Sequence, residues 1–496
     1  MHTHDHNHKT GQSNCNCCGM SRRCFLASSA AAASAPLVGA AASGAEDLGE
    51  YIDLESFRPK PKVRIMSCVI RLKPPYWLGW PGTAYDVEGF RKKYAREFDE
   101  SAERVGVQIE REREPLESDE AVAAYVKKLK AEKPDAVLIT MQHLSTWKWA
   151  DAVAKAGLPT IVFSPVGTSF THHTREISRR PGVYVISTLD TSAVEQAMKM
   201  IRAKRQLEQT RVLVLRGEDR NETVLERLGT KIRYAPRRLL HELFEKMPEN
   251  DETREIADKM MKHAKDIVEP DRQDVLNAAR SFQTAKRLLH DEKSNAITTD
   301  CLGMVTSKLV PTPPCMAATM FQDAGVTYGC EADLFAAISL LFVSYVFDRP
   351  GFQNDPVAET VANRLIVAHC TCGTRLNGFD EPQEPYVLRS HSESDIGVAT
   401  QILWKVGQPV TLVRFQDPNS LILDTGTVVG NVQTPPAGGC RTSVEVEMDR
   451  VRDSRDVLGF HQAVFYGNWR REVEAFAQLY GIKVINSPET PPKRKV

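Results

Sequence analysis

A net charge is absent from this chain. Lys plus Arg and Asp plus Glu both number 64 among the 496 residues. A balanced surface makes no field that would attract nucleic acid or an anionic membrane, so we expect neither as a partner. Glycine-rich G-x-G-x-x-G and Walker loops are also absent, and no nucleotide cofactor is implied. These absences favour a small-molecule enzyme or a neutral interaction protein.

Long hydrophobic runs and a regular cysteine framework are absent as well. The most apolar predicted helix, residues 334–347, is shorter than the roughly 17 to 25 residues that span a bilayer, so we expect no membrane span. Of the eleven cysteines, four lie before residue 45 and the other seven are widely spaced. This odd number predicts no disulfide framework, and at least one thiol that is free or paired between chains.

Residues 1–45 differ in composition from the rest of the chain. Arg22 and Arg23 precede an uncharged, Ala- and Ser-rich stretch at the end of this segment, which is typical of a twin-arginine export signal. We therefore expect an exported, periplasmic protein. The alternative is a low-complexity segment without signal activity, which would leave the protein cytoplasmic. We assign no function to the His and Cys residues ahead of the arginines.

From residue 62, apolar runs alternate with amphipathic helices, a pattern that predicts parallel sheets covered on both faces. We expect an α/β protein with two Rossmann-like α/β domains, residues 46–170 and 171–350. The predicted strands are residues 63–70, 136–141, 159–163, 211–216 and 295–299. The predicted helices are residues 86–105, 147–156 and 274–290, a charged helical insertion at 237–273, and the apolar helix headed by Glu331.

After Pro356 the pattern changes to short β runs separated by Gly and Pro, without intervening helices. Such spacing predicts an antiparallel sheet or barrel. We expect a mostly antiparallel, barrel-like C-terminal β domain over residues 351–496, with a closing helix at 469–480. The predicted β runs are residues 365–371, 386–391, 410–415, 421–429 and 442–448.

Three residues form the candidate catalytic and metal-binding set: Glu331, Asp355 and His461. Each also has a structural explanation. A carboxylate in the first turn of a helix complements the helix dipole, an Asp before Pro is a common turn residue, and a lone His is often a core or surface residue. Two hard oxygen ligands with one imidazole would suit a divalent cation such as Mn²⁺ or Mg²⁺.

Context favours the functional interpretation. The helix after Glu331 is apolar on nearly every side, so its entrance is expected at a cleft or domain boundary. Two carboxylates about 4 Å apart repel by about 4 kcal/mol at an effective dielectric of 20. A divalent cation removes that repulsion; otherwise one carboxyl group has to stay protonated.

Several short motifs occur in an order that resembles the L-fucose isomerase and L-arabinose isomerase superfamily. The resemblance covers roughly residues 295–470 and extends more weakly to the α/β part before it. The motifs are Pro314-Cys315-Met316-Ala317, Asp323-Ala324-Gly325, Cys330-Glu331-Ala332-Asp333-Leu334, Asn354-Asp355, Ala368-His369-Cys370-Thr371, and the late His461 with Tyr466-Gly467.

The resemblance implies a metal-dependent aldose–ketose isomerase, an intramolecular oxidoreductase that acts on a small sugar through a metal-bound cis-enediol. It implies that Glu331, Asp355 and His461 bind Mn²⁺, or another divalent cation such as Mg²⁺ or Co²⁺. The two acids would also be catalytic, moving a proton between sugar carbons C1 and C2. A homo-oligomer, a trimer or hexamer, is implied as well.

Four further residues are candidates for substrate contact. His369 is interpreted as a fourth ligand or a hydroxyl-orienting residue, and His391 either lines the site or ends a strand. Trp77 and Trp80 follow the first strand, where a loop faces the ligand crevice of a parallel sheet. They would form a wall for the sugar, or else contact another subunit.

Cys370, Cys372 and Cys440, with His369, also allow a soft structural metal site, although buried thiols commonly serve as packing residues. Two alternative functions stay open. One is an exported carbohydrate-binding protein that kept the isomerase fold without turnover. The other is a related metal-assisted sugar epimerase or lyase.

Overall fold

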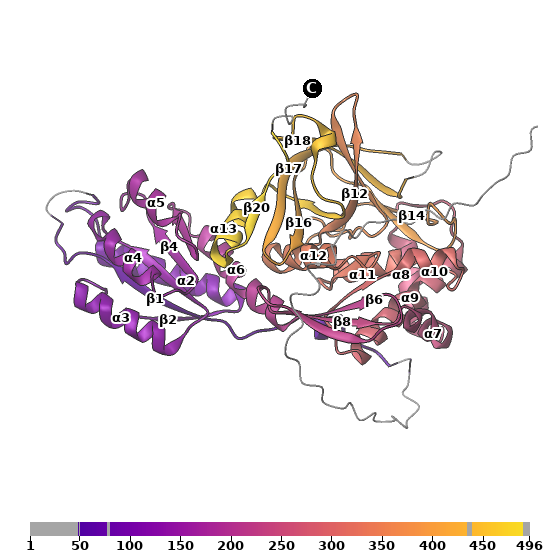
Figure 1. Ribbon diagram of the computed structural model, residues 1–496, viewed down its shortest axis with the longest axis horizontal. Helices are drawn as coiled ribbons and strands as arrows, with labels where there is room; N and C mark the ends of the chain where they lie inside the picture. Colours follow the sequence, from indigo (N-terminus) through magenta and orange to yellow (C-terminus); the bar gives the residue numbers. More distant parts are fainter. Residues whose placement is uncertain (1–47, 49, 77–79, 434–438, 490–496) are drawn as a thin grey trace, which may run out of the picture. The chain divides into compact units, whose positions relative to one another are not determined.

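The computed structural model of the protein describes residue 48 and residues 50–76, 80–433 and 439–489 (Figure 1). The chain divides at Asp47 into two units, the second of which begins at Leu48. The predicted twin-arginine segment and Trp77 lie outside the described residues.

The first sheet has five parallel strands in the order β2-β1-β3-β4-β5. They are β1 (Arg64–Ile70), β2 (Gln108–Arg111), β3 (Ala136–Met141), β4 (Thr160–Ser164) and β5 (Val183–Ser187). Its helices are α2 (Val87–Val105), α3 (Asp119–Glu132), α4 (Trp147–Ala154), α5 (Thr171–Ile177) and α6 (Ser192–Gln209). The short 3-10 helices η1 (Leu54–Phe57) and η2 (Leu144–Thr146) lie in its connections.

Both faces of this sheet are covered, as the sequence predicts. Ile65 packs with α2 and α6 on one face, and the next residue, Met66, packs with α3 and α4 on the other. Successive side chains of a strand point to opposite faces, so a strand buried on both faces is apolar at every position rather than at alternate ones.

The second sheet has the order β11-β10-β6-β8-β7 and is parallel except for its edge strand β7. Its strands are β6 (Arg211–Leu215), β7 (Asn221–Leu225), β8 (Thr230–Ala235), β10 (Ala296–Thr299) and β11 (Tyr328–Cys330). The β7–β8 pair was not predicted, because β7 is an exposed edge strand without an apolar run. The predicted charged insertion forms α7 (Arg238–Lys246), α8 (Asp251–His263) and β9 (Asp266–Ile267).

Helices α9 (Arg272–Asp291) and α11 (Cys315–Asp323) cover one face of the second sheet together with α7, and α10 (Cys301–Thr306) follows β10. The other face packs against α6 and α12 (Leu334–Phe347). Twelve of the fourteen residues of α12 are buried. This helix is apolar all round because it lies between the second sheet and the strands that follow it.

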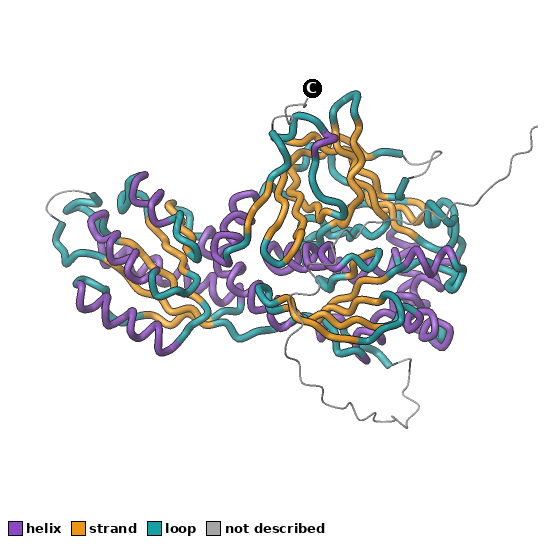
Figure 2. Tube along the Cα trace, viewed as in Figure 1, coloured by secondary structure: helices purple, strands orange, loops and turns teal. Residues whose placement is uncertain are grey.

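Six antiparallel strands form a closed barrel in the order β16-β19-β12-β13-β18-β17, closed by the pairing of β16 with β17 (Figure 2). They are β12 (Phe352–Glu359), β13 (Arg364–His369), β16 (Pro409–Asp417), β17 (Ser420–Asn431), β18 (Thr442–Met448) and β19 (Gln462–Tyr466). The 3-10 helix η3 (Ser454–Asp456), helix α13 (Arg470–Tyr480) and β20 (Lys483–Ile485), which pairs with β17, complete the chain.

Two predictions for this region were incomplete. The run 386–391 is not a barrel strand: β14 (Tyr386–Arg389) pairs with β15 (Ala399–Ile402) and β9 in a separate three-stranded sheet. Strand β12 was not predicted, because Pro356 in its middle reads as a breaker. Pro356 has its register partner in Val367 of β13, in a strand that continues on both sides of the proline.

The fold is thus mixed α/β, with parallel sheets and a closed six-stranded antiparallel barrel. One hydrophobic cluster contains residues from both parallel sheets, α12 and the barrel. The expected division into two Rossmann-like domains, with boundaries near residues 170 and 350, stays a prediction. Among the described residues, no helix combines the length and the apolarity needed to cross a bilayer.

Candidate metal centre

Glu331, Asp355 and His461 meet in space, and His369 joins them. One ligand atom from each of the four residues lies within 4.8 Å of the others. His461 Nε2 lies 3.0 Å from Asp355 Oδ1 and 3.4 Å from Glu331 Oε2. We call these four residues the acid–imidazole cluster. They come from the β11–α12 turn, β12, the end of β13 and the residue before β19.

The sequence suggested that Glu331 lies in the first turn of a helix, but it does not. It occupies the turn between β11 and α12, and its backbone is left-handed at φ 59°, as is that of Ala332 at φ 51°. Asp333 is the N-cap of α12 and accepts a hydrogen bond from Ala336 N at 2.9 Å. Left-handed backbone is costly for residues other than Gly and concentrates at functional sites.

Strand β12 aligns the elements that carry the cluster. The Gln353 amide accepts a hydrogen bond from Cys330 N at 3.0 Å and donates one to Cys330 O at 3.2 Å, next to Glu331. The neighbouring Asn354 donates from Nδ2 to Gln462 O at 2.7 Å, next to His461. Both amide side chains are fully buried. Gln353 and Asn354 therefore hold the residues next to Glu331 and His461, and Asp355 itself belongs to the acid–imidazole cluster.

Asp355 lies inside a strand and not in a turn. Its register partner on β13 is Ala368, so the following residue, His369, lies beside it at the strand end. The Asp355 carboxylate keeps about a third of its surface exposed (30%), and that of Glu331 28%, whereas the two imidazoles are 4% exposed. Access to the cluster is thus from the carboxylate side.

His461 is oriented by Asp333. Its Nδ1 lies 2.9 Å from Asp333 Oδ2, and Arg414 Nη1 lies 2.9 Å from the same carboxylate oxygen. Arg414 also donates to His461 O at 3.1 Å, which holds the left-handed backbone of His461 at φ 56°. Arg414 balances the negative charge of Asp333. The negative charges of Glu331 and Asp355 have no such arginine beside them in the acid–imidazole cluster.

The pKa values of Asp333 and His461 are set by their burial and by the charged groups close to them. Burial by itself would raise the pKa of Asp333, but the hydrogen bond from His461 and the charge of Arg414 lower it to about 2. Burial would lower the pKa of His461, but Asp333, Asp355 and Glu331 raise it to about 11. A proton on His461 is therefore favoured unless another cation takes its place among the carboxylates.

The donor set fits a divalent cation. His369 Nε2 is buried without a hydrogen bond, and Glu331 Oε1 lies 3.9 Å from it. Asp355 Oδ1 and His461 Nε2 are also buried and face each other at 3.0 Å. Buried polar atoms are nearly always paired, so the open position of His369 Nε2 beside two carboxylates and a second imidazole leaves room for a further partner. Two carboxylates with an imidazole are the ligands that Mn²⁺ and related cations accept.

His369 differs from His461 in its tautomer. The backbone N–H of Cys370 donates to His369 Nδ1 at 2.8 Å, so the proton of a neutral ring is on Nε2, the atom 3.9 Å from Glu331 Oε1. A protonated nitrogen is a hydrogen-bond donor and not a metal ligand. Of the two interpretations of His369, this geometry favours the orienting residue.

The remaining candidates lie elsewhere. His391, in the loop after β14, groups with Cys315 and Cys370 and not with the acid–imidazole cluster. Trp80 is 55% exposed, and its ring centroid lies 6.0 Å from that of Phe170. In the same loop Tyr76 packs edge-on against His143, with centroids 4.6 Å apart, where β1 and β3 end. No contact of this loop with the cluster is seen in the described residues.

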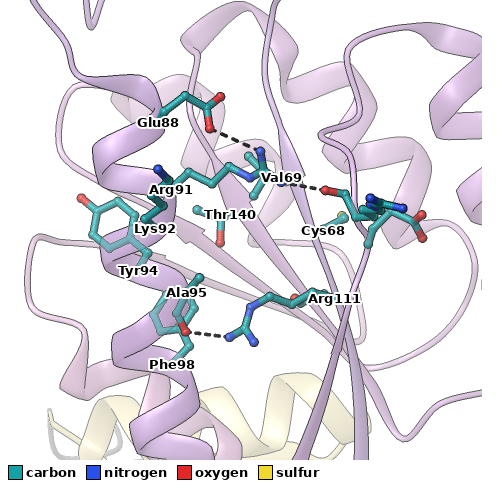
Figure 3. A pocket seen from close by; sticks show the side chains of 13 residues that line it. Cys68, Val69, Glu88, Arg91, Lys92, Tyr94, Ala95, Phe98, Arg111 and Thr140 are labelled. Carbon is teal, nitrogen blue, oxygen red and sulfur yellow. Dashed lines mark hydrogen bonds and ion pairs between the residues drawn. The ribbon is translucent and has the colours of Figure 1, made fainter.

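The first sheet has a cavity of about 370 Å³ between α2 and strands β1 and β2 (Figure 3). Two of its cationic side chains are paired: Arg91 with Glu88 and with Arg113 O, and Arg111 with Asp99 and with Ala95 O. The lining also includes Lys92 and Arg113 but no histidine, and none of its residues belongs to the acid–imidazole cluster, so this cavity is not the candidate centre.

The chain is similar in sequence to a curated sugar isomerase. The chain is 25% identical over 174 residues to the sulfoquinovose isomerase of Clostridium sp. (strain MSTE9). That relative is a sugar isomerase. The match covers 34% of this chain and spans 39% of the relative's length. No protein-family model matches the chain.

Two solved structures were also compared. A periplasmic solute-binding protein of an ABC transporter from Actinobacillus succinogenes 130z, with bound D-allose, has 12% identity and a TM-score of 0.17 over 50% of this chain and 84% of that one. A XylFII-LytSN complex has 13% identity and a TM-score of 0.15 over 55% and 99%. Likenesses this low carry no argument about fold or function.

Sequence reasoning gave no role to Asp333 or Arg414. An Asp immediately before a long apolar run is a helix N-cap signal, and it identifies Asp333 as a capping residue. Arg414 is a charged residue inside an otherwise apolar predicted strand. Such a residue needs a buried partner, but the sequence does not say which one.

Proposed function

We propose that this protein is a metal-dependent aldose–ketose isomerase acting on a small sugar. The observation that carries the proposal is the convergence of two carboxylates and an imidazole within 4.8 Å of one another, beside a second imidazole. The likeness to a sulfoquinovose isomerase supports a sugar as the substrate class.

Glu331, Asp355 and His461 would hold the cation, with Mn²⁺ as first candidate and Mg²⁺ or Co²⁺ as alternatives. Bound there, a divalent cation supplies a Lewis acid and a template for two neighbouring sugar oxygens. Asp333 keeps the proton of neutral His461 on Nδ1, so that Nε2 offers its lone pair to the ion. The charges of Glu331 and Asp355 match the two positive charges of the cation.

Glu331 and Asp355 would also move the protons. One carboxylate would remove the proton from C2 of the aldose, and the electron pair of that C–H bond would form the C1–C2 double bond of a cis-enediol skeleton, leaving its negative charge on O1. The other carboxylate would take the proton from O2 and pass it to O1. The C2 carbonyl would then form, and the first carboxyl group, whose proton exchanges with solvent, would protonate C1. Atoms balance, because one hydrogen leaves C2 and one arrives at C1, and one proton moves from O2 to O1.

His369 would orient the substrate. Its Nε2–H points to the cluster beside Glu331 Oε1, where a sugar oxygen could accept a hydrogen bond. A donor already held in place by a backbone N–H loses little freedom on binding, which makes it effective in stabilising charge that develops on oxygen.

The test is a sugar screen with purified protein loaded with Mn²⁺, Mg²⁺ or Co²⁺ in ²H₂O. The screen covers aldopentoses, 6-deoxyaldohexoses and sulfoquinovose. The proposal expects ketose formation that depends on metal, with solvent deuterium at C1 of the product. Glu331→Gln and Asp355→Asn should each lower turnover at least about 1,000-fold. Glu447→Gln, an exposed carboxylate of β18, is the matched control and should not change turnover.

Other outcomes point to the alternatives. Sugar binding that needs no metal and survives Glu331→Gln without turnover would indicate a carbohydrate-binding protein. Conversion to an epimer or a dehydrated product would indicate a metal-assisted epimerase or lyase. Absence of metal binding to the acid–imidazole cluster would overturn the proposal.

We also propose export through the twin-arginine segment and assembly as a homotrimer or homohexamer. Support comes from Arg22 and Arg23 with the small-residue stretch after them, and from the family resemblance. Fractionation of cells expressing the full chain, with Arg22→Lys and Arg23→Lys as a double variant, tests export. Light scattering of the purified protein tests the assembly.

A further inference from the structure

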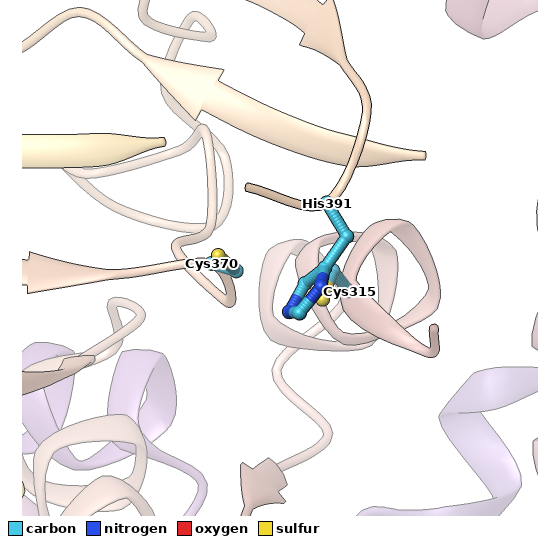
Figure 4. Close-up of side chains that lie close together, drawn as sticks. All are labelled: Cys315, Cys370 and His391. Atoms are coloured by element: carbon cyan, nitrogen blue, oxygen red, sulfur yellow. The ribbon is translucent and has the colours of Figure 1, made fainter. Parts of the chain in front are cut away.

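A second group of potential metal ligands lies next to the acid–imidazole cluster. Cys315, Cys370 and His391 present one ligand atom each within 4.8 Å of one another, and all three are buried (Figure 4). Cys315 begins α11, Cys370 directly follows β13, and His391 lies in the loop after β14. These elements are far apart in the sequence, so the grouping is a product of the fold.

Cys440 adds a third sulfur. It packs against Cys315 and Cys370 in one small apolar cluster that also contains Ala399. Three sulfurs and one imidazole therefore lie in one part of the fold, with ligand atoms of Cys315, Cys370 and His391 within 4.8 Å of one another and Cys440 packed against them.

His391 is arranged as a ligand would be. Its Nδ1 lies 2.8 Å from Ser394 Oγ, which can accept the Nδ1 proton and leave the Nε2 lone pair for an ion. Arg441 donates to Ser390 O at 2.7 Å and to Ser390 Oγ at 2.9 Å. Arg441 follows Cys440 and Ser390 precedes His391, so these bonds hold the segments of Cys440 and His391 together.

We propose that Cys315, Cys370, Cys440 and His391 bind a structural zinc ion. Three sulfurs with one imidazole are a common set for closed, four-coordinate zinc. Zn–S bonds of about 2.3 Å and Zn–N bonds of about 2.0 Å place tetrahedral ligand atoms about 3.5 to 3.8 Å apart. Cys315, Cys370 and His391 therefore have to contract by at most about 1 Å, and the Cys440 sulfur has to move towards them. A disulfide would use only two of the sulfurs and leave the imidazole without a role.

This site differs from the soft site considered from the sequence. Cys370 and Cys440 belong to it, but Cys372 donates to Gly373 O and packs in a separate apolar cluster. His369 faces the acid–imidazole cluster. Consecutive residues thus serve two sites, with His369 at the harder oxygen-rich one and Cys370 at the softer one. Ligand softness would keep zinc and manganese apart.

The zinc would fix the segment that carries His369. The Cys370 N–H that donates to His369 Nδ1 belongs to a proposed zinc ligand, so zinc binding would hold the donor that sets the His369 tautomer. The zinc site does not depend on the isomerase proposal, because its ligands are not residues of the acid–imidazole cluster.

The first test is elemental analysis of the full chain purified under reducing conditions without added metal. We expect about one zinc per chain in the wild type and in Glu331→Gln, and less than about one tenth in Cys370→Ser and Cys315→Ser. Cys372→Ser is the matched control, since it removes a buried thiol two residues from Cys370, and it should keep its zinc.

The second test needs no variant. Wild-type protein exchanged into Co²⁺ should show the sulfur-to-cobalt charge-transfer absorption and the intense visible bands of a tetrahedral thiolate site. Glu331→Gln should show the same spectrum. Wild-type protein without zinc, with its cysteines titrating as free thiols or mapped as a disulfide, would overturn the proposal. Loss of the zinc in Glu331→Gln would overturn it too, since the ion would then belong to the acid–imidazole cluster.

Discussion

His461 Nδ1 and Asp333 Oδ2 lie 2.9 Å apart, and this hydrogen bond decides which imidazole nitrogen faces Glu331 and Asp355. Asp333 also caps α12 and pairs with Arg414. One carboxylate therefore joins the start of the most buried helix to the orientation of a candidate metal ligand.

Removing the charge of Asp333 should weaken the metal centre without unfolding the protein. We expect Asp333→Asn to reduce Mn²⁺ affinity by about 10- to 100-fold, because the residue that orients a ligating imidazole loses its charge. Asn is also a good N-cap, so the change in stability should stay within about 1 kcal/mol. Calorimetric metal titration measures the affinity. Asp86→Asn, which alters the cap of α2 in the first sheet, should bind metal as the wild type does.

His369 and His461 should respond differently to truncation. If His369 is a donor, His369→Ala should change metal affinity by less than about threefold but lower turnover by about 100-fold, as loss of one oriented donor does. His461→Ala should lose metal binding. Metal titration combined with steady-state kinetics separates the two. A loss of affinity in His369→Ala as large as that in His461→Ala would assign His369 as a ligand instead.

Gln353 should control both stability and the position of Glu331. Gln353→Met removes both hydrogen bonds to Cys330 and leaves its buried backbone N–H without this acceptor, while Cys330 O keeps the bonds from Asp333 N and Thr298 Oγ1; the change should cost about 1 to 3 kcal/mol. Turnover per folded molecule should fall too, because the turn that carries Glu331 is no longer held to β12. Urea unfolding and kinetics measure the two effects.

The matched control for this variant is Gln206→Met, which removes the hydrogen bond from a buried Gln to Pro59 O. It should lower stability and leave turnover per folded molecule unchanged. Equal loss of turnover in both variants would show that Gln353 acts only through global stability.

Asp348 should make stability depend on pH. Burial would raise the pKa of Asp348, but Arg202 and Lys199 lower it below its ordinary value. Its contribution is therefore present above the unfolded pKa of about 3.9 and is lost as the pH falls through the lower folded pKa. Asp348→Asn should cost about 1 kcal/mol at pH 7 and progressively less towards pH 3, since the ion pairs are partly exposed.

Urea unfolding of wild type and Asp348→Asn at both pH values checks this, with the exposed Asp380→Asn as control. Asn tolerates the left-handed backbone of residue 348 at φ 51°, so the substitution changes charge and not conformation. An equal difference between wild type and variant at both pH values would exclude the ion pairs as its source.

The sequence by itself determined the local features that depend on periodicity and residue type. Apolar strands buried on both faces are the reason that β1, β3, β4, β6 and β10 could be predicted. A run of apolar residues as long as a helix predicted that α12 is buried on nearly every side. Short β runs without helices predicted the barrel. Glu331, Asp355 and His461 could be selected as candidates because oxygen and nitrogen ligands are chemically distinctive and because their motifs resemble those of the isomerase superfamily in order; their role as a site stays a prediction.

Only the tertiary structure decided how these features meet. Strand β12 escapes a local interpretation because Pro356 normally ends a strand, and the register of β12 with β13 and β19 overrides that preference. The left-handed turn at Glu331, the Asp333–His461–Arg414 contacts and the meeting of Cys315, Cys370 and His391 depend on pairs far apart in the chain. Periodicity reports which face of an element is buried, but not which distant residue that face will meet.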